Sequence, residues 1–446
     1  MAVSPARSAA FEILLRVERK HSYAAELLHS APRAKLSSRD HALATELTMG
    51  VLRWQSLVDQ RLAAASWQKI ERLDDEVRTA LRLGAYQLHF LTRVPARAAI
   101  FESVELVKAA RKRSAASFVN AVLRRIANAD AENSFAQIEK SADVIALARN
   151  SAHPAWLVER WTRQYGLEAT RKICVHDQTV PATAIHLHDD AEHIEPELAA
   201  AGVQLADGSL VTSARRVLAG DVTATLSYRE GRITIQDEAS QLVALLVGRG
   251  EKLLDCCAAP GGKTAMLAQR HPSAEVWATE LHPHRARLLR SLIRLPNVRV
   301  IAADARHLPF VFAFDRILAD VPCSGTGTLA RNPEIKWRLE ANDLHDLASR
   351  QVAILKSALA QLASGGRLVY STCSLEREEN EEVVEAALEG NTKFSVVDCN
   401  AELERMRESG EMFLLEMPSL LAGPYLRTIP GVHPCDGFFA ALIERK

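Results

Sequence analysis

The feature that most constrains the fold of this 446-residue chain is a regular alternation of short apolar runs and helical segments that begins near residue 237. Alternation of this kind predicts a mostly parallel, doubly wound sheet, because two parallel strands need a crossover connection, usually a helix. We therefore expect an α/β, Rossmann-like domain over residues 237–446. The apolar runs of strand length lie at 252–256, 275–279, 298–302, 316–319 and 367–371.

The turn after the first of these strands narrows the choice of ligand. It reads Asp255-Cys-Cys-Ala-Ala-Pro-Gly-Gly-Lys-Thr264 and leads into a helix. Glycines let the backbone approach a ligand closely, and the unpaired N–H groups at a helix start bind a carboxylate. A phosphate-binding Walker loop would need glycine where this chain has Cys257, and the glycine pattern of nicotinamide-binding folds is missing. A methyl-donor fold is the better match, and a tight turn without a ligand is the alternative.

Acidic residues follow the next two strands. In an open α/β sheet, ligands bind beyond the carboxyl ends of the strands. Glu280 ends the second strand, where a carboxylate would hold two ribose hydroxyls, and Asp304 follows the third, where it could meet an adenine amino group. Both positions fit a nucleoside-containing cofactor.

Two cysteines and an aspartate follow the fourth and fifth strands. Asp320-Val-Pro-Cys323 follows one strand, and Ser371-Thr-Cys373 follows the next. A lone cysteine is more often a small buried apolar residue, but two of them on the cofactor rim suit C5 methylation of a pyrimidine. A thiolate adds to carbon 6 and makes carbon 5 nucleophilic; Lys263 would favour the thiolate, and Asp320 would stabilise the adduct at the N3 edge of the ring.

The first 129 residues form a different, basic module. They carry 21 Lys and Arg against 12 Asp and Glu, although the whole chain balances 55 against 55. Helical spacing of apolar residues predicts helices at 77–91, 98–112 and 117–127. A polyanionic partner is plausible for such a module, and a solvated helical surface is the alternative. The basic cluster consists of Lys108, Arg111, Lys112, Arg113, Arg124 and Arg125.

The middle of the chain, residues 130–236, predicts a connector followed by a small α/β subdomain. A helix is expected near 157–165, and strands are expected at 183–188 and 232–236. The seven cysteines are an odd number without a Cys-x-x-Cys pair, which argues against a disulfide framework or a zinc site. No run approaches the ~18 apolar residues of a membrane helix, and the N-terminus does not resemble a signal peptide. We expect a cytoplasmic protein with no bound metal.

These motifs carry a resemblance to a known family. The segments CCAAPGGKT, DVPCSGTGTLARNPEIKW and STCSLEREENEEVV resemble those of RNA cytosine-C5 methyltransferases of the RsmB/Sun (Fmu) and NOL1/NOP2 kind. The basic N-terminus is similar to a NusB-like RNA-binding domain. The resemblance implies an all-α NusB-like bundle over 1–129, a linker and small α/β subdomain over 130–236, and a Rossmann-like class I methyltransferase over 237–446.

The resemblance also implies roles for individual residues. Cys373 would be the nucleophile and Cys323 would assist release of the methylated base, with the reverse assignment as the internal alternative. Glu280 stands where an aspartate is common, and Cys256, where an apolar residue is usual, is expected to face the core. The S-adenosyl-L-methionine site would consist of Cys257, Ala258, Ala259, Pro260, Gly261, Gly262, Lys263, Glu280, Asp304 and Asp320.

Other residues allow two interpretations. Lys336, Trp337 and Arg338, together with Arg331, could contact RNA, although Trp337 could equally lie in the core. Asp237 and Gln241 could lie near the active site, or could be a helix cap and a surface residue. The acidic run 376–389 predicts a solvated helix.

The resulting expectation is a monomeric S-adenosyl-L-methionine-dependent 16S rRNA (cytosine-C5)-methyltransferase that forms 5-methylcytosine before or during assembly of the small ribosomal subunit. The target base must be unstacked or presented in a loop. The first alternative is the same chemistry on tRNA or another RNA. The second is a non-catalytic RNA-binding or antitermination factor, which would need neither the two cysteines nor Lys263 and Asp320.

Overall fold

The computed structural model divides the chain into two compact units. The helical unit comprises residues 1–180 together with 329–338, and the sheet unit comprises 181–328 together with 339–446. The described residues are 3–28, 36–129, 133–188, 191–413 and 419–446.

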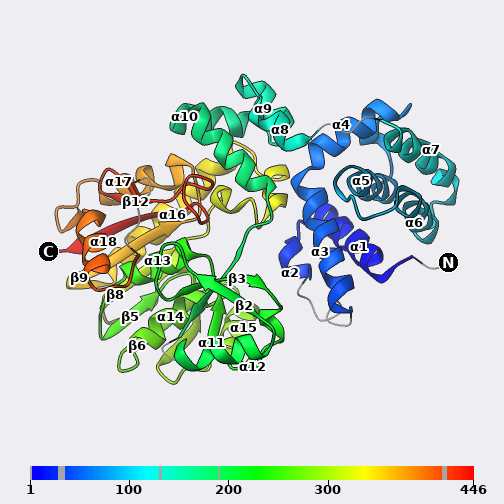
Figure 1. Cartoon of the computed structure of the whole chain (residues 1–446). Helices are drawn as coiled ribbons and strands as arrows, with labels where there is room; N and C mark the ends of the chain where they lie inside the picture. Colours follow the sequence, from blue (N-terminus) through cyan, green and yellow to red (C-terminus); the bar gives the residue numbers. More distant parts are fainter. Residues whose placement is uncertain (1–2, 29–35, 130–132, 189–190, 414–418) are drawn as a thin grey trace. The chain divides into compact units, whose positions relative to one another are not determined.

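The helical unit begins with a bundle of helices (Figure 1). Apolar side chains of these helices are buried in the bundle. The helices expected at 77–91, 98–112 and 117–127 are confirmed as α5, α6 and α7. Helix α7 buries the stripe Phe118, Val119, Val122, Leu123 and Ile126, so its basic residues stay on the exposed side. The bundle elements are α1 (Pro5–Lys20), α2 (Ala24–Leu28), α3 (Ser38–Arg53), α4 (Gln55–Ala65), η2 (Ile70–Arg72), α5 (Asp75–Phe90), α6 (Ala96–Ala109), η3 (Arg113–Ala115) and α7 (Ala116–Ala127).

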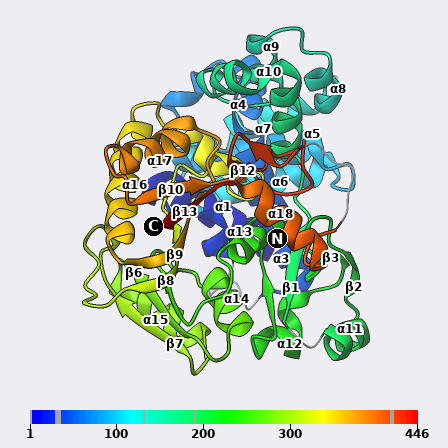
Figure 2. The same ribbon diagram turned by 90° about the vertical axis from the view of Figure 1, so that its left-hand side faces the viewer.

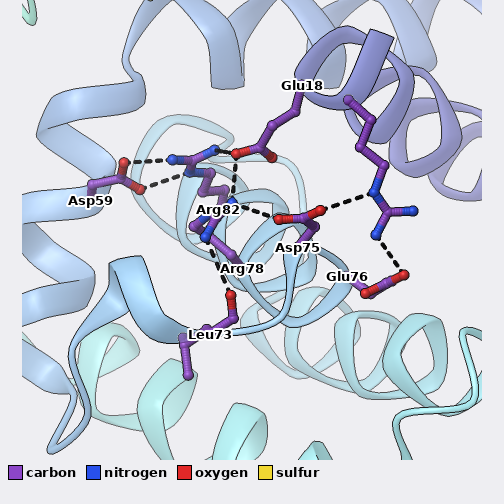
Figure 3. A network of polar contacts seen from close by, with 8 residues as sticks. Glu18, Asp59, Leu73, Asp75, Glu76, Arg78 and Arg82 are labelled. Carbon is purple, nitrogen blue, oxygen red and sulfur yellow. Dashed lines mark hydrogen bonds and ion pairs between the residues drawn. The ribbon is translucent and has the colours of Figure 1, made fainter.

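A polar network ties three helices of the bundle together (Figure 3). Arg82 of α5 donates two hydrogen bonds of 2.8 Å to the carboxylate of Asp59 on α4. Arg78, one turn earlier on α5, donates to Glu18 of α1 at 2.7 Å and to Asp75 at 2.8 Å. A bidentate guanidinium–carboxylate pair fixes direction as well as distance, so this network sets how α1, α4 and α5 pack.

Three further helices and one inserted segment complete the helical unit. The helix expected at 157–165 is the start of α10, which continues past a kink at Gly166. Residues 329–338 follow the cysteine motif at 323 in sequence but pack in this unit, where they form η7. These elements are α8 (Ser134–Glu139), α9 (Val144–Asn150), α10 (Ala155–Gln178) and η7 (Pro333–Trp337).

The inserted segment corrects one expectation. Lys336 is only 2% exposed, and its ammonium group donates to the backbone oxygens of Arg53 and Ala152 at 2.8 and 3.0 Å. Trp337 donates its indole N–H to the oxygen of Leu52 at 2.7 Å. The guanidinium of Arg338 likewise donates to backbone oxygens of the helical unit. These three side chains anchor the segment. The expectation that Lys336 contacts RNA was wrong because Lys336 is buried, the core alternative for Trp337 agrees with its bond to Leu52, and RNA contact by the partly exposed Arg338 stays a prediction.

The main sheet of the sheet unit confirms the predicted doubly wound order. Its strands run β11-β12-β13-β9-β8-β5-β6-β7, with β10 beside β13, and the five strands from β9 to β7 are parallel. The sequence did not predict the antiparallel C-terminal edge, in which β13 pairs with β9. The strands are β5 (Lys252–Asp255), β6 (Glu275–Glu280), β7 (Val298–Ala302), β8 (Phe314–Asp320), β9 (Leu362–Thr372), β10 (Phe394–Val397), β11 (Leu421–Ala422), β12 (Tyr425–Arg427) and β13 (Phe439–Arg445).

Helices cover both faces of this sheet, which is why its strands are apolar on both sides. Leu253 of β5 belongs to the core under α13, α14 and α18, whereas the next residue, Leu254, belongs to the core under α16 and α17. Figures 1 and 2 show the sheet between these helices. The helices are α13 (Glu238–Leu246), α14 (Gly262–Arg270), α15 (Pro283–Leu292), α16 (Asp343–Ala360), α17 (Glu381–Leu388) and α18 (Cys399–Glu408), with short turns η5 (Ala305–His307), η6 (Thr326–Thr328) and η8 (Arg377–Glu379).

A small antiparallel sheet precedes the main one in the same unit (Figure 2). The strands expected at 183–188 and 232–236 are confirmed as β1 and β4, whereas β2 and β3 were not predicted. The carboxylate of Glu238, at the start of α13, accepts N–H groups from the loop between β2 and β3 and joins the two sheets. The elements are β1 (Thr183–Leu187), α11 (Ala191–Ala200), β2 (Gln204–Asp207), β3 (Ala214–Ala219), η4 (Val222–Ala224), α12 (Leu226–Arg229) and β4 (Ile233–Ile235).

A search of the described helices for a bilayer-spanning segment found none that combines the necessary length with the necessary apolar character.

Candidate active site

The two cysteines after β8 and β9 lie side by side. These strands pair in parallel with Asp320 opposite Ser371, so the loops that follow them leave the sheet at the same point. The sulfur of Cys323 is 3.3 Å from the sulfur of Cys373, within hydrogen-bond distance for two thiols. The expectation that both cysteines occupy one rim of the sheet agrees with this geometry.

Backbone contacts hold the Cys323 loop against the Cys373 loop. The N–H of Gly327 donates to the oxygen of Cys373 at 2.9 Å, and the oxygen of Gly327 accepts from Gly437 at 2.8 Å. A side chain at position 327 would place its Cβ 2.2 Å from the oxygen of Gly437, so only glycine allows this approach. The Gly-rich sequence after Cys323 therefore serves close packing between loops.

A partly buried ion pair lies near the cysteines. Lys263, at the start of α14, places its ammonium 2.8 Å from Asp320, whose other oxygen accepts from the hydroxyl of Ser371 at 2.8 Å. Burial lowers the pKa of Lys263. The charge and hydrogen bond of Asp320, together with the charge of Cys373, outweigh burial, so the net pKa of Lys263 is raised. Lys263 therefore stays cationic, and its positive charge interacts with the side chain of Cys373.

Cys323 has a strong preference for its protonated form. Its hydrogen bond with Cys373, burial, the charge of Cys373 and the charge of Glu379 together raise the pKa of the Cys323 thiol well above its ordinary value. Either sulfur can be the donor of the 3.3 Å contact, and the raised pKa of Cys323 favours Cys323 in that role. The two thiols are chemically different although they touch.

Glu379 is a site residue that the sequence did not reveal. It lies in the acidic run 376–389, which we expected to be a solvated helix, but Glu376 and Glu379 are fully buried. Only the part of the run after Asn380 forms an α-helix, α17, and Glu382 on that helix is exposed. The expectation of a solvated run was wrong for its first turn, because η8 turns those side chains inward beneath the cysteine loops.

The glycine-rich turn after β5, residues 256–264, forms a cradle at the end of the strand. Asp255 accepts from the hydroxyl of Thr264 at 2.6 Å and from the N–H of Cys257 at 3.3 Å, and burial raises the pKa of this carboxyl to about 6. Gly261 has φ of +118°, and a Cβ there would lie 2.6 Å from Leu289. The turn from sheet to helix therefore requires glycine at this position.

The remaining members of the predicted cofactor set occupy this cradle or its rim. Cys257 is half-buried and Cys256 is 1% exposed within the core, which confirms that Cys256 faces inward. Burial raises the pKa of both thiols well above the ordinary value, so neither competes with the Cys373 sulfur as a nucleophile. Ala258 is held to β6 by a 2.9 Å bond from its N–H to the oxygen of Thr279, and Ala259, Pro260 and Gly262 complete the turn.

The two expected nucleoside-binding carboxylates end neighbouring strands. Glu280 is 6% exposed at the end of β6 and accepts the N–H of His282 at 2.9 Å. Asp304 follows β7, accepts the N–H of Arg306 and pairs with its guanidinium at 2.6 Å; these hydrogen bonds lower the pKa of Asp304. The guanidinium of Arg285 lies 3.9 Å from Glu280, whereas Arg306 pairs closely with Asp304.

Residues just before α13 line the same cradle. The side-chain oxygen of Gln236 is buried and has no hydrogen-bond partner among the described residues. It lies 3.2 Å from where a Cβ on Gly262 would stand. Asp237 caps α13 through the N–H of Ala239 at 2.9 Å. Gln241 is fully buried and donates to the oxygen of Gln236 at 2.9 Å. The helix-cap interpretation of Asp237 is correct, Gln241 is not a surface residue, and Gln236 was missed by sequence reasoning.

Comparison with known proteins adds family relationships to this geometry. The family model for 16S rRNA methyltransferase RsmB/F matches residues 242–444, and the NusB family model matches residues 4–128. The chain is 34% identical to a probable ribosomal RNA small subunit methyltransferase B of Bacillus subtilis (strain 168), over 99% of this chain and 98% of that protein. It is 31% identical to the ribosomal RNA small subunit methyltransferase B of Vibrio cholerae, over 93% of this chain and 92% of that protein.

Solved structures share the fold. One aligns over the whole of both chains with a TM-score of 0.80 at 22% identity. A methyltransferase homologue from Pyrococcus horikoshii gives a TM-score of 0.57 at 25% identity, covering 69% of this chain and 100% of that chain. NSun6 from Pyrococcus horikoshii with SFG gives a TM-score of 0.57 at 20% identity, covering 66% of this chain and 99% of that chain.

Proposed function

The chain belongs to the RsmB/F family of 16S rRNA methyltransferases, and from this premise we propose that it forms 5-methylcytosine in 16S rRNA through a covalent cysteine adduct. The observation that carries the proposal is the pair of unlike thiols, 3.3 Å apart, beside the Lys263–Asp320 ion pair. A methyltransferase acting on an oxygen or nitrogen atom needs no second thiol, whereas carbon 5 of cytosine needs covalent activation.

Cys373 is the proposed nucleophile. Its sulfur lies 3.3 Å from the Cys323 sulfur and interacts electrostatically with the ammonium of Lys263, a cation that can pair with the attacking sulfur. Attack on carbon 6 forms the C–S bond and pushes an electron pair to carbon 5, which then takes the methyl group. Asp320 is proposed to meet the N3 edge of the ring, where its carboxyl group offsets charge that develops in the adduct.

Cys323 is proposed to assist the release step. Loss of the carbon 5 proton to a base returns an electron pair to the ring and expels the sulfur of Cys373. The S–H of Cys323 lies against that sulfur and stabilises it as the leaving thiolate. The reverse assignment would require the thiol with the raised pKa, Cys323, to act as the nucleophile.

S-adenosyl-L-methionine is the proposed methyl donor, and the residues of the cradle fit it. The turn needs glycine at position 261. The oxygen of Gln236, which has no partner in the described part of the chain, offers an acceptor for an amino group, and Glu280 offers one for ribose hydroxyls. Asp304 would meet the adenine amino group after adjusting its pairing with Arg306. When bound, the cofactor supplies an electrophilic methyl group. NSun6, solved with SFG, shares this fold.

The other parts of the chain are proposed to deliver the RNA. We propose a NusB-like RNA-binding domain over 1–129, a linker and small subdomain over 130–236, and the methyl-transfer domain over 237–446. The exposed Arg111, Arg113 and Arg124 of the first part suit phosphate contacts. The proposed setting is a cytoplasmic monomer that acts before or during small-subunit assembly.

The test uses the full chain, labelled methyl donor and three RNAs: naked 16S rRNA, small subunits and bulk tRNA, with bisulfite mapping of the product. We expect methylation of one or more cytosines in 16S rRNA by the wild type and none by Cys373→Ala. Cys323→Ala should accumulate a protein–RNA adduct, visible as a shifted band on a denaturing gel. An adduct in Cys373→Ala instead would exchange the two roles, and methylation of tRNA alone would replace the proposed substrate.

A further inference from the structure

One buried carboxylate joins the two cysteine loops. Glu379 is 0% exposed, and its carboxylate accepts from the N–H of Ser324 at 2.8 Å and from the hydroxyl of Ser324. It also accepts from the hydroxyl of Ser374 at 2.5 Å and from the amide of Gln351 at 2.9 Å. Four donors therefore converge on Glu379 from three different segments of the sheet unit.

Two of these donors are the residues that immediately follow the cysteines. Ser324 follows Cys323 and Ser374 follows Cys373, and their hydroxyl oxygens are 3.0 Å apart above the carboxylate. Any movement of one loop away from the other would break a hydrogen bond to Glu379. The 3.3 Å contact between the two sulfurs thus depends on a link one residue further along each loop.

The carboxylate is itself held from several sides. The hydroxyl of Tyr370, on β9, donates to the backbone oxygen of Glu379 at 2.6 Å. Asn380 accepts from the hydroxyl of Thr372 at 2.5 Å and donates to the oxygen of Ser374 at 2.9 Å. Gln351 of α16 donates also to the oxygen of Pro322 at 2.9 Å. Glu379 is therefore fixed relative to the sheet and positions the loops rather than following them.

A negative charge at this place has a chemical consequence as well as a structural one. Burying a carboxylate is unfavourable unless its hydrogen bonds compensate, and four neutral donors do so here. Together with the hydrogen bond to Cys373, burial and the charge of Cys373, the charge of Glu379 raises the pKa of Cys323. A neutral side chain could link the loops but would not favour the protonated thiol.

We propose that Glu379 is a positioning residue of the methyl-transfer reaction, which holds the Cys323 thiol against the Cys373 sulfur so that the covalent adduct resolves. The inference rests on the proposed function, because it presupposes that adduct. It assigns Glu379 no contact with the base or the methyl donor. Its loss should slow release of the product rather than binding of RNA.

Two variants of Glu379 separate the effect of its hydrogen bonds to the two loops from the effect of its negative charge. Glu379→Ala leaves the N–H of Ser324 without its acceptor and removes the bridge. Glu379→Gln keeps the shape: its oxygen can accept from the N–H of Ser324 and the amide of Gln351, and its NH₂ can donate to the two serine hydroxyls. Glu382→Ala is the matched control, because Glu382 belongs to the same acidic run but is exposed on α17.

With 16S rRNA as the probe, we expect Glu379→Ala to lower kcat by up to about 100-fold, the effect of a misplacement of about 1 Å, without a comparable change in KM. It should accumulate the same denaturant-stable adduct as Cys323→Ala. Glu379→Gln should recover part of the rate, and Glu382→Ala should match the wild type. Combining Glu379→Ala with Cys323→Ala should add no further loss, because both changes act on one step.

The pH dependence of thiol labelling tests the electrostatic effect of Glu379 on Cys323, which a purely structural role would leave unchanged. Alkylation of Cys323, read by peptide mass spectrometry against pH, should begin at lower pH in both Glu379 variants, since the nearby negative charge is gone. The inference is overturned if the Glu379→Ala protein turns over at the wild-type rate. It is also overturned if that protein loses activity but shows neither an accumulated adduct nor a shifted labelling profile. Full activity of Cys373→Ala would instead overturn the proposed function itself.

Discussion

Replacing Lys336 with methionine tests the buried anchor of the inserted segment in the helical unit. The Lys336 ammonium donates to two backbone oxygens, and burial is the main reason that its pKa falls to about 7. Nearby Asp177 and Cys174 oppose this shift, and Arg53 adds to it. Methionine has nearly the same length and cannot titrate. It leaves the oxygen of Ala152 without its donor, whereas the oxygen of Arg53 keeps a bond from Gln178.

The sign of the pH effect follows from the lowered pKa. Between pH 7 and the ordinary lysine value of 10.5, the unfolded chain holds one proton more than the folded chain, so the free energy of unfolding rises with pH. One proton is worth about 1.4 kcal/mol per pH unit, and the gain between pH 7 and about 8.5 is on the order of 1 to 2 kcal/mol. The pKa of the Cys174 thiol is raised to about 12, so this group lowers the free energy of unfolding only at pH values above the ordinary thiol pKa of 9.0.

Urea titrations with pulse proteolysis, read on peptides from α10, would follow the helical unit without assuming one transition for the whole chain. We expect the unfolding free energy of wild type to gain about 1 to 2 kcal/mol over Lys336→Met between pH 7 and about 8.5. Lys69→Met, at an exposed position, is the control and should keep the wild-type slope. If the unfolding free energy of Lys336→Met changed with pH as steeply as that of the wild type, Lys336 would not be a buried group that titrates in this range. A large loss of RNA affinity in Lys336→Met would restore the hypothesis that Lys336 contacts a phosphate.

Three further changes probe the site and the RNA module. Mild oxidation with diamide should join Cys323 to Cys373, lower the intact mass by two hydrogens and abolish activity until a thiol reductant is added; persistence of both free thiols in the oxidised protein would contradict the 3.3 Å geometry. Gly261→Ala should weaken S-adenosyl-L-methionine binding about tenfold in calorimetry, since a left-handed alanine costs roughly 1–2 kcal/mol, and unaltered affinity would mean that the turn tolerates a side chain. Combining Arg113→Ala with Arg124→Ala should weaken binding of 16S rRNA in filter assays and reduce the salt slope by about one for each phosphate that an arginine no longer neutralises; an unchanged slope would remove these arginines from the interface.

The sequence by itself determined the parts of this protein that local patterns encode. The strands at β5 to β9 follow from their apolar runs, and the turn Asp255–Thr264 follows from its glycines. Because parallel strands end at one edge, the positions of Cys323 and Cys373 after neighbouring runs were enough to place them together. Periodicity and turn chemistry depend on adjacent residues, so they can be recognised without knowing what packs against them.

Only the tertiary structure decided which charged residues are buried. Lys336 and Glu379 both stand in polar stretches that suggested solvent or RNA, yet one anchors a segment in the helical unit and the other joins the two cysteine loops. Their partners are distant in sequence: Arg53 for Lys336, and Ser324 for Glu379. A buried charge is stable only when specific donors or acceptors surround it, and those groups come together only when distant segments fold onto one another.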